Sequence, residues 1–207
     1  MKKILYVILH GSMNPDRYYN VKNTWGKDVD CLFYSDHEDK DKNIVKVSDR
    51  TDYGSNEEKH VNSLHYVSNN IKDYDWFFFC DDDTFVNTKK MNEMISSFDE
   101  ESVHGSVLEG TWPNDRSLNY CSGGAGYLIH KNLLNKITNH VKLLNSGYSD
   151  VTLGLFLREL NIKSFDYPLF RSQPPSFFGI SHVDYKHYIS FHYIKTFDEM
   201  NNLLNNL

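Results

Sequence analysis

The stretch DWFFFCDDDTFVN, residues 75–87, places three adjacent carboxylates directly after a run of large apolar side chains. Successive side chains of a strand point to opposite faces of its sheet, so an unbroken apolar run is typical of a central strand covered on both faces. Adjacent negative charges repel one another unless they are solvated or surround a cation. The stretch therefore predicts a buried strand with a strongly acidic carboxyl end.

Apolar runs alternate with amphipathic segments on both sides of this stretch. The alternation predicts an α/β fold with a mostly parallel central sheet flanked by helices, and it continues without linker or repeat over residues 1–207. We therefore expect one domain. The expected strands cover residues 3–10, 30–36, 43–49, 75–80, 105–110, 121–130, 165–170 and 187–194; the expected helices cover residues 14–26, 55–71, 87–98, 131–144, 149–160 and 196–207.

Two of the expected helices carry capping signals at their starts. Ser55 is followed three residues later by Glu58, which matches a capping box. Ser149 or Asp150 is expected to cap the helix over residues 149–160. Both signals predict where these helices begin.

The composition suits a globular domain with an acidic balance of charge. With 207 residues, 40% of them hydrophobic, the chain can bury a substantial core. Its net charge of -6 argues against nucleic acid as a partner, because phosphate binding requires a basic face. The 14 tyrosines and 13 phenylalanines suit a sugar or nucleotide pocket, although they can also simply fill the core.

The cysteines and the first residues bear on the cellular compartment. Cys31, Cys80 and Cys121 form no C-x-x-C pair, and their odd number and wide spacing favour a reducing compartment. The apolar run at residues 4–9 is shorter than the roughly 7–15 residues of a signal-peptide core, so we interpret it as the first strand. No stretch approaches the roughly 20 apolar residues of a membrane span. We therefore expect a soluble, cytoplasmic protein without a membrane anchor.

The position of the three carboxylates indicates a binding site, because ligands of open α/β sheets bind outside the carboxyl ends of the strands. Asp81 and Asp83 form a D-x-D pair that can hold a divalent cation, which in turn can bridge a diphosphate. A phosphotransferase of the haloacid-dehalogenase type requires D-x-D-x-T, but Phe85 stands at the threonine position. The spacing of a calcium-binding EF-hand loop is absent. The D-x-D pair alone is equally compatible with a polar turn that binds no ligand.

Five segments of the chain contain the motifs NTWG, DDDTFV, CSGGAGY, SDVTLG and SFHY. In these segments the chain resembles the Fringe-like β-1,3-glycosyltransferases of glycosyltransferase family 31, which include core 1 galactosyltransferases. Each motif is weakly specific, but the five follow the order of the family and cover most of the chain. Lys22 departs from a frequent arginine of the family, and several paired cysteines and the usual membrane anchor are missing. The five segments are residues 21–36, 73–87, 120–134, 148–162 and 189–195.

The resemblance implies a GT-A fold and an inverting transfer of galactose or N-acetylglucosamine from a UDP-sugar to a hydroxyl of a glycan or glycoconjugate, which forms a β-1,3 link. It implies Mn²⁺ or Mg²⁺ as the cofactor, with Asp83 as a direct ligand, Asp81 in support and His192 completing the site. It also implies that Asp150 is the general base, since inverting transfer needs a carboxylate opposite the leaving group.

Each of these roles has a plainer alternative. His192 alone would be typical of a buried strand histidine, and His182 or His187 could replace it as a ligand. Asp150 could simply cap its helix. For the whole chain, the alternatives are a sugar- or nucleotide-binding module without turnover and the phosphotransferase considered above. The combination of the D-x-D pair, Asp150 and His192 argues against the binding module.

Two further sets of residues are assigned to the substrates. Lysine can contact the donor phosphate or uracil, a tryptophan can stack on a sugar face, and a glycine-rich turn lets the backbone approach a sugar closely. Core packing, a solvated lysine and a simple tight turn are the alternatives. The donor-binding set is Thr24, Asp36, Lys59 and Asp82, and the sugar or acceptor pocket set is Trp112, Gly123, Gly124 and Ala125.

Overall fold

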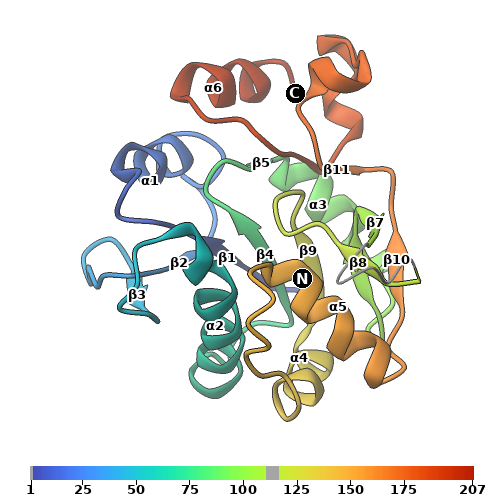
Figure 1. Cartoon of the computed structure of the whole chain (residues 1–207). Coiled ribbons are helices and arrows are strands. Elements are labelled where there is room, and N and C mark those ends of the chain that lie inside the picture. Colours follow the sequence, from blue (N-terminus) through green and yellow to red (C-terminus); the bar gives the residue numbers. More distant parts are fainter. Residues whose placement is uncertain (1, 111–116) are drawn as a thin grey trace.

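In the computed structural model, which describes residues 2–110 and 117–207, a seven-stranded sheet has the order β10-β6-β9-β4-β1-β2-β3 (Figure 1). All its neighbouring strands are parallel except β9, which is antiparallel to both β4 and β6. This confirms the predicted mostly parallel sheet. The strands are β1 (Ile4–Leu9), β2 (Cys31–Ser35), β3 (Ile44–Lys46), β4 (Trp76–Asp81), β6 (Val103–Gly105), β9 (Tyr127–His130) and β10 (Ser164–Asp166).

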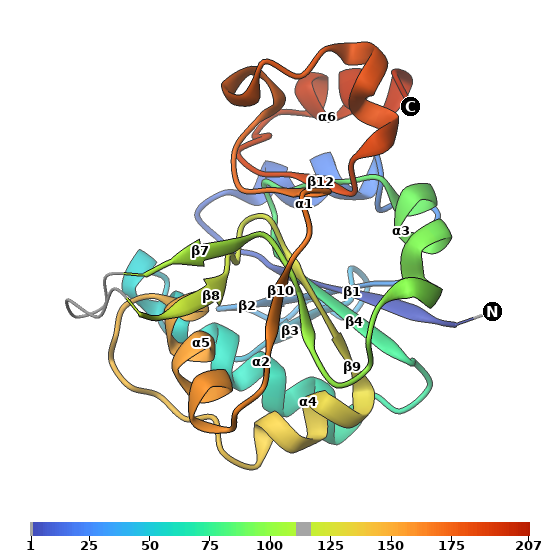
Figure 2. The ribbon, with the colours of Figure 1, turned by 90° about the vertical axis from the view of Figure 1, so that its right-hand side faces the viewer.

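Helices cover both faces of this sheet, as Figure 2 shows. One face carries α2 (Asn56–Asn70), α4 (Lys131–Thr138) and α5 (Ser149–Glu159), and the other carries α1 (Pro15–Lys22), α3 (Thr88–Met94) and α6 (Phe197–Asn205). None of the helices in the described part of the chain has the length and apolar character of a membrane span. The smaller elements are η1 (Tyr53–Ser55), η2 (Ile95–Ser97), η3 (Pro175–Phe178), η4 (His182–His187), the three-stranded sheet of β11 (Phe170–Arg171), β12 (Ser190–Phe191) and β5 (Phe85–Val86), and the hairpin of β7 (Val107–Glu109) and β8 (Asn119–Cys121).

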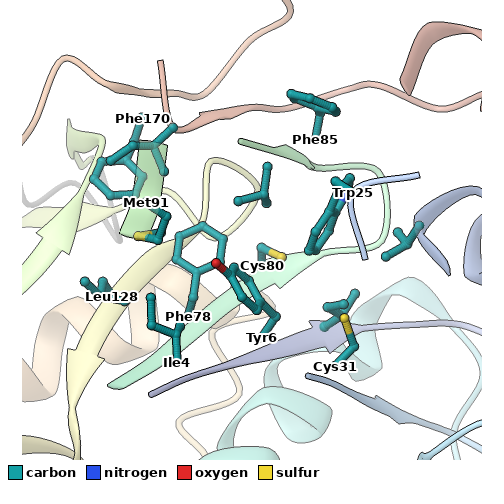
Figure 3. Close-up of a cluster of buried hydrophobic side chains, with 14 of the residues drawn as sticks. Ile4, Tyr6, Trp25, Cys31, Phe78, Cys80, Phe85, Met91, Leu128 and Phe170 are labelled. Atoms are coloured by element: carbon teal, nitrogen blue, oxygen red, sulfur yellow. The ribbon is translucent and has the colours of Figure 1, made fainter. Parts of the chain in front are cut away.

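The strand β4 lies at the centre of the core. Its first five residues, Trp76 to Cys80, are each no more than 2% exposed, and alternate ones belong to the two hydrophobic clusters on opposite faces of the sheet. Figure 3 shows Phe78 in one of these clusters, beside Tyr6 and Met91. Its ring also stacks on Phe170 with 6.0 Å between centroids. The apolar run is therefore buried on both faces, as the sequence predicts.

The predicted capping box at the start of α2 is wrong. Ser55 ends η1 and already has helical backbone angles, so its side chain does not face the first free N–H groups of α2. Its hydroxyl donates instead to the carbonyls of Arg50 and Asp52. Glu58 lies 3.7 Å from Arg50. A short 3₁₀ turn that runs directly into the helix leaves no extended residue to act as the cap.

The predicted cap of the helix at residues 149–160 is also wrong. The N-cap position of α5 is the extended residue Tyr148, and Ser149 and Asp150 both lie in the first helical turn. Because the helix begins one residue earlier than a cap at Ser149 requires, Ser149 and Asp150 are helical residues, and the Asp150 carboxylate can also make contacts outside the helix. The Asp150 carboxylate can therefore face the site described below.

The substitution Phe78→Ala should lower the free energy of unfolding by about 3–5 kcal/mol, because it leaves a cavity in the most buried strand. The control is Phe177→Ala, whose ring is 70% exposed and whose loss should change stability by no more than about 0.5 kcal/mol. Urea unfolding followed by circular dichroism measures both values. Equal losses in the two variants would contradict the central place of Phe78 in the core.

Candidate functional site

The three carboxylates stand at the carboxyl edge of the sheet, where β1 and β4 end side by side. These strands pair in parallel from Ile4 with Trp76 to Leu9 with Asp81. The turn after β4 is held by the Thr84 hydroxyl, which donates to the carbonyl of Gly124 at 2.7 Å. Side chains that follow β1 in the sequence are therefore brought directly to the acidic turn.

Asp82 is buried and contacts two groups that follow β1. His10 Nδ1 lies 2.9 Å from one carboxylate oxygen, and Arg17 donates to the other at 3.0 Å. The same Arg17 nitrogen is 3.4 Å from Asp83. Burial opposes the charge of Arg17, but the neighbouring carboxylates outweigh it and raise the pKa of the guanidinium. Asp82 therefore fixes Arg17 against the acidic turn.

Asp81, Asp83 and His192 form a cluster with the spacing of metal ligands. One oxygen or nitrogen atom from each lies within 4.8 Å of the others. His192 Nε2 is 3.2 Å from Asp83 and 3.7 Å from Asp81. Carboxylates suit Mg²⁺ and Mn²⁺, and imidazole suits transition metals, so this mixed donor set fits a divalent cation such as Mn²⁺.

The ionisation of the cluster follows from its surroundings. Desolvation and the neighbouring carboxylates raise the pKa of Asp81 above its usual range. Burial alone would also raise the pKa of Asp83, but the hydrogen bond from His192 and the charge of Arg17 outweigh burial and lower this pKa. Burial disfavours a charged His192, yet Asp83 and Asp81 together raise its pKa. The ionised form of Asp81 is therefore disfavoured in this setting, and a bound cation would stabilise it.

A cavity with two lobes opens above this cluster. The larger lobe has a volume of about 480 Å³ and the smaller about 280 Å³, and Asp81, His192 and Tyr193 line both. The cations Arg17, Lys59 and Lys195 line only the larger lobe. Asp150, Gly123 and Gly124 line only the smaller lobe. The two lobes therefore differ in charge and meet at the candidate metal ligands.

Asp150 faces the smaller lobe from the first turn of α5. Its Oδ2 accepts the Gly123 N–H at 3.2 Å, and its Oδ1 accepts the Val151 N–H at 2.9 Å. Burial raises the pKa of Asp150, although these backbone donors work in the opposite direction. The side chain is therefore oriented and partly desolvated, which suits a general base.

The glycine-rich turn explains how His192 reaches the cluster. A Cβ on Gly124 would lie 2.0 Å from His192 Cε1, so no larger residue leaves room for the imidazole ring. On its other side the ring stacks on Tyr193 at 3.8 Å. Tyr193 has a φ of +61°, so the strand alternation expected through residue 194 ends at Phe191. His192 is thus held between a glycine and an aromatic ring.

Lys59 and Asp36, both assigned to the donor from the sequence, form a buried ion pair. Lys59 Nζ lies 2.9 Å from Asp36 Oδ2, and the two side chains are 2% and 1% exposed. Burial opposes the charge of Asp36, but hydrogen bonds from Lys59 and Ser12 lower its pKa to about 2. Lys59 lines the larger lobe, so Asp36 orients a lysine at the cavity wall.

Other residues assigned from the sequence are placed elsewhere. The structure does not bring Thr24 to the cavity, because its buried hydroxyl donates to the carbonyl of Asn20 at 2.6 Å. Ala125 is fully buried beneath the glycine-rich turn, where its carbonyl accepts from Ser190. Trp112 lies outside the described residues. His182 and His187 lie in η4 and are not in the ligand cluster of the described chain.

The sequence analysis missed several residues of the cavity. Arg17 and His10 have no motif, and they reach the acidic turn only because β1 and β4 are adjacent. Tyr53 lies in η1, is 77% exposed and lines both lobes. Tyr193 was expected to alternate with His192 along a strand. The SFHY motif was the one signal that could have indicated Tyr193.

Three comparisons place the chain among known proteins. A family model described as Fringe-like matches residues 11–206. Chondroitin sulfate glucuronyltransferase of Homo sapiens is 32% identical over 71 residues, which are 33% of this chain and 9% of that protein. The chain thus spans less than a tenth of the length of this relative.

Two solved structures share the fold. A glycosyltransferase involved in the glycosylation of the major capsid of PBCV-1 has a TM-score of 0.53 and 12% identity, over 99% of this chain and 98% of that one. The galactosyltransferase LgtC has the same TM-score and identity, over 98% and 96%. These neighbours support the predicted GT-A fold. Since the family model covers almost the whole sequence, the chain belongs to the Fringe-like family.

Proposed function

We propose that the protein is an inverting, metal-dependent glycosyltransferase that moves galactose or N-acetylglucosamine from a UDP-sugar to a hydroxyl of a glycan or glycoconjugate, forming a β-1,3 link. One observation carries the proposal. The Asp81–Asp83–His192 cluster and the Asp150 carboxylate face a cavity whose two lobes share Asp81 and His192. A donor in one lobe and an acceptor in the other would meet at these residues.

The larger lobe suits the nucleotide half of the donor. Its walls carry Arg17, Lys59 and Lys195, whose positive charges complement a diphosphate. Asp81, Asp83 and His192 would hold Mn²⁺ or Mg²⁺ at its boundary. A bound divalent cation supplies positive charge that stabilises the leaving diphosphate.

The smaller lobe suits the acceptor and the base. Asp150 would take the proton from the acceptor hydroxyl as that oxygen attacks the anomeric carbon. The Gly123 N–H holds one carboxylate oxygen in place for this transfer. Tyr148, which is 52% exposed at the wall of this lobe, offers an aromatic surface for a sugar ring.

The comparisons support the class of reaction and leave the donor sugar to experiment. The family model is Fringe-like, and the two structural neighbours are glycosyltransferases. The human relative is named for glucuronyl transfer and LgtC for galactosyl transfer. A screen of UDP-sugars with mass detection of UDP and product tests the identity of the donor. Membership of glycosyltransferase family 31, in a subgroup similar to core 1 galactosyltransferases, is part of the proposal.

The substitution Asp150→Asn should reduce transfer by at least roughly 100-fold, because an amide cannot accept the proton. UDP binding, measured by calorimetry, should stay close to that of the wild type, since Asp150 lies outside the larger lobe. The matched control is Asp198→Asn, which alters an exposed aspartate in the first turn of α6. Near-normal turnover of Asp150→Asn would remove Asp150 from the role of base.

UDP should bind more tightly in Mn²⁺ than in EDTA, because the cation joins the diphosphate to the Asp81–Asp83–His192 cluster. Calorimetry measures both affinities, and a titration with Mn²⁺ alone tests the metal site without a nucleotide. Asp83→Asn should abolish the difference, whereas Asp198→Asn should preserve it. Equal UDP affinity of the wild type with and without metal would contradict the metal site.

Activity should fall at low pH as Asp150 becomes protonated, since a general base works in its ionised form. Burial raises the pKa of this carboxyl, so the midpoint of the acidic limb should lie above the ordinary aspartate value of about 3.9. The measurement is kcat/KM for the acceptor against pH, with circular dichroism to verify folding. A midpoint at or below the ordinary value would show that another group controls the limb.

A further inference from the structure

Glu57 is a buried carboxylate with an unusual set of partners. It lies in the first turn of α2 and is 3% exposed. Its Oε1 accepts from the Leu144 N–H at 2.7 Å and from the Thr152 hydroxyl at 3.0 Å. Its Oε2 accepts from the Gly147 N–H at 2.9 Å and from the Ser146 hydroxyl at 3.1 Å. Backbone and hydroxyl groups therefore solvate this charge.

These bonds stabilise the ionised form. Burial opposes the charge of Glu57, but the donors from Leu144, Gly147, Thr152 and Ser146 outweigh it and lower the pKa. A charged carboxylate binds such donors more strongly than a neutral amide does. Glu57 is therefore suited to hold several groups of another segment in fixed positions.

The segment that Glu57 holds is the loop before α5 together with the helix itself. Asn145 and Gly147 have φ values of +56° and +77°, so the loop turns through the left-handed region at two positions. The Ser146 hydroxyl also lies 2.7 Å from the Thr152 hydroxyl of α5. Glu57, Ser146 and Thr152 thus form one polar cluster, which we call the Glu57 clamp.

The Glu57 clamp joins two walls of the cavity. On one side, Asn56 and Lys59 of the same helix line the larger lobe. On the other side, residues 147–150 line the smaller lobe, and Asp150 lies only two residues from Thr152. A shift of the loop would therefore move Asp150 relative to the donor side.

We propose that Glu57 is a positioning residue, which sets the distance between the Asp150 carboxylate and the donor lobe. The inference rests on the proposed transferase function. It differs from a purely stabilising role, because a misplaced base lowers kcat while the donor lobe still binds its ligand. Misplacement of a reacting group by about 1 Å can cost roughly 100-fold in rate.

The test uses the whole chain with Glu57→Gln, which keeps the size of the side chain and replaces one acceptor oxygen by a donor. The matched control is Glu58→Gln, the next residue of the same turn, whose carboxylate is 26% exposed and faces Arg50. We expect Glu57→Gln to lower kcat roughly 10–100-fold, with the KM for the donor and the Kd for UDP within about two-fold of the wild type. Hydrogen exchange at the Leu144 and Gly147 amides should accelerate in this variant only.

A second pair of variants covers the case in which Glu57→Gln does not fold. Thr152→Val removes the hydroxyl from the clamp and should lower kcat, whereas Thr152→Ser keeps the hydroxyl and should retain most of the activity. Faster exchange with kcat within about two-fold of the wild type would overturn the inference, since the clamp would then only stabilise the loop. An equal loss in Glu58→Gln would also overturn it. A wild type without any transfer activity would contradict the proposed function instead.

Discussion

The three carboxylates after β4 can stay together because hydrogen-bonding and charged partners from distant parts of the chain surround them. His10 and Arg17, which follow β1, both contact the Asp82 carboxylate, and Arg17 also lies beside Asp83. His192 approaches Asp83 from the other end of the chain. The balance is incomplete, because the pKa of Asp81 stays raised. A bound divalent cation would favour the ionised form of Asp81 at such a site.

The need to place a partner beside the Asp83 carboxylate also explains the path of residues 190–194. β12 pairs with β5 directly after the acidic turn, and the Ile194 N–H donates to the Asp83 carbonyl at 2.8 Å. Tyr193 therefore takes a left-handed backbone, which costs free energy at a residue other than glycine. Gly124 leaves room for the His192 ring on the opposite side. The left-handed backbone at Tyr193 and the lack of a Cβ at Gly124 together allow the His192 imidazole to reach the cluster.

Charged side chains reach the cavity from both helical layers of the fold. Arg17, from α1, and Lys195, which precedes α6, line the larger lobe, while Asp150 of α5 lines the smaller one. The helices α1 and α5 cover opposite faces of the sheet (Figure 2), and the lobes share Asp81 at the carboxyl end of β4. The Glu57 clamp connects the donor lobe to the loop before α5. Two structural neighbours share this fold at 12% identity, so the arrangement of layers persists where most side chains differ.

The sequence by itself determined the central strand and the acidic turn that follows it. The unbroken apolar run of β4 requires burial on both faces, and the D-x-D pair directly follows it. The family motifs also indicated His192 and Asp150 in advance. Capping of α2 and α5 was predicted wrongly, because a preceding 3₁₀ turn and the extended Tyr148 change the backbone at the helix starts. Only the tertiary structure decided the partners of the charges. Arg17, His10 and Glu57 carry no local signal, since their contacts join segments between 65 and 95 residues apart.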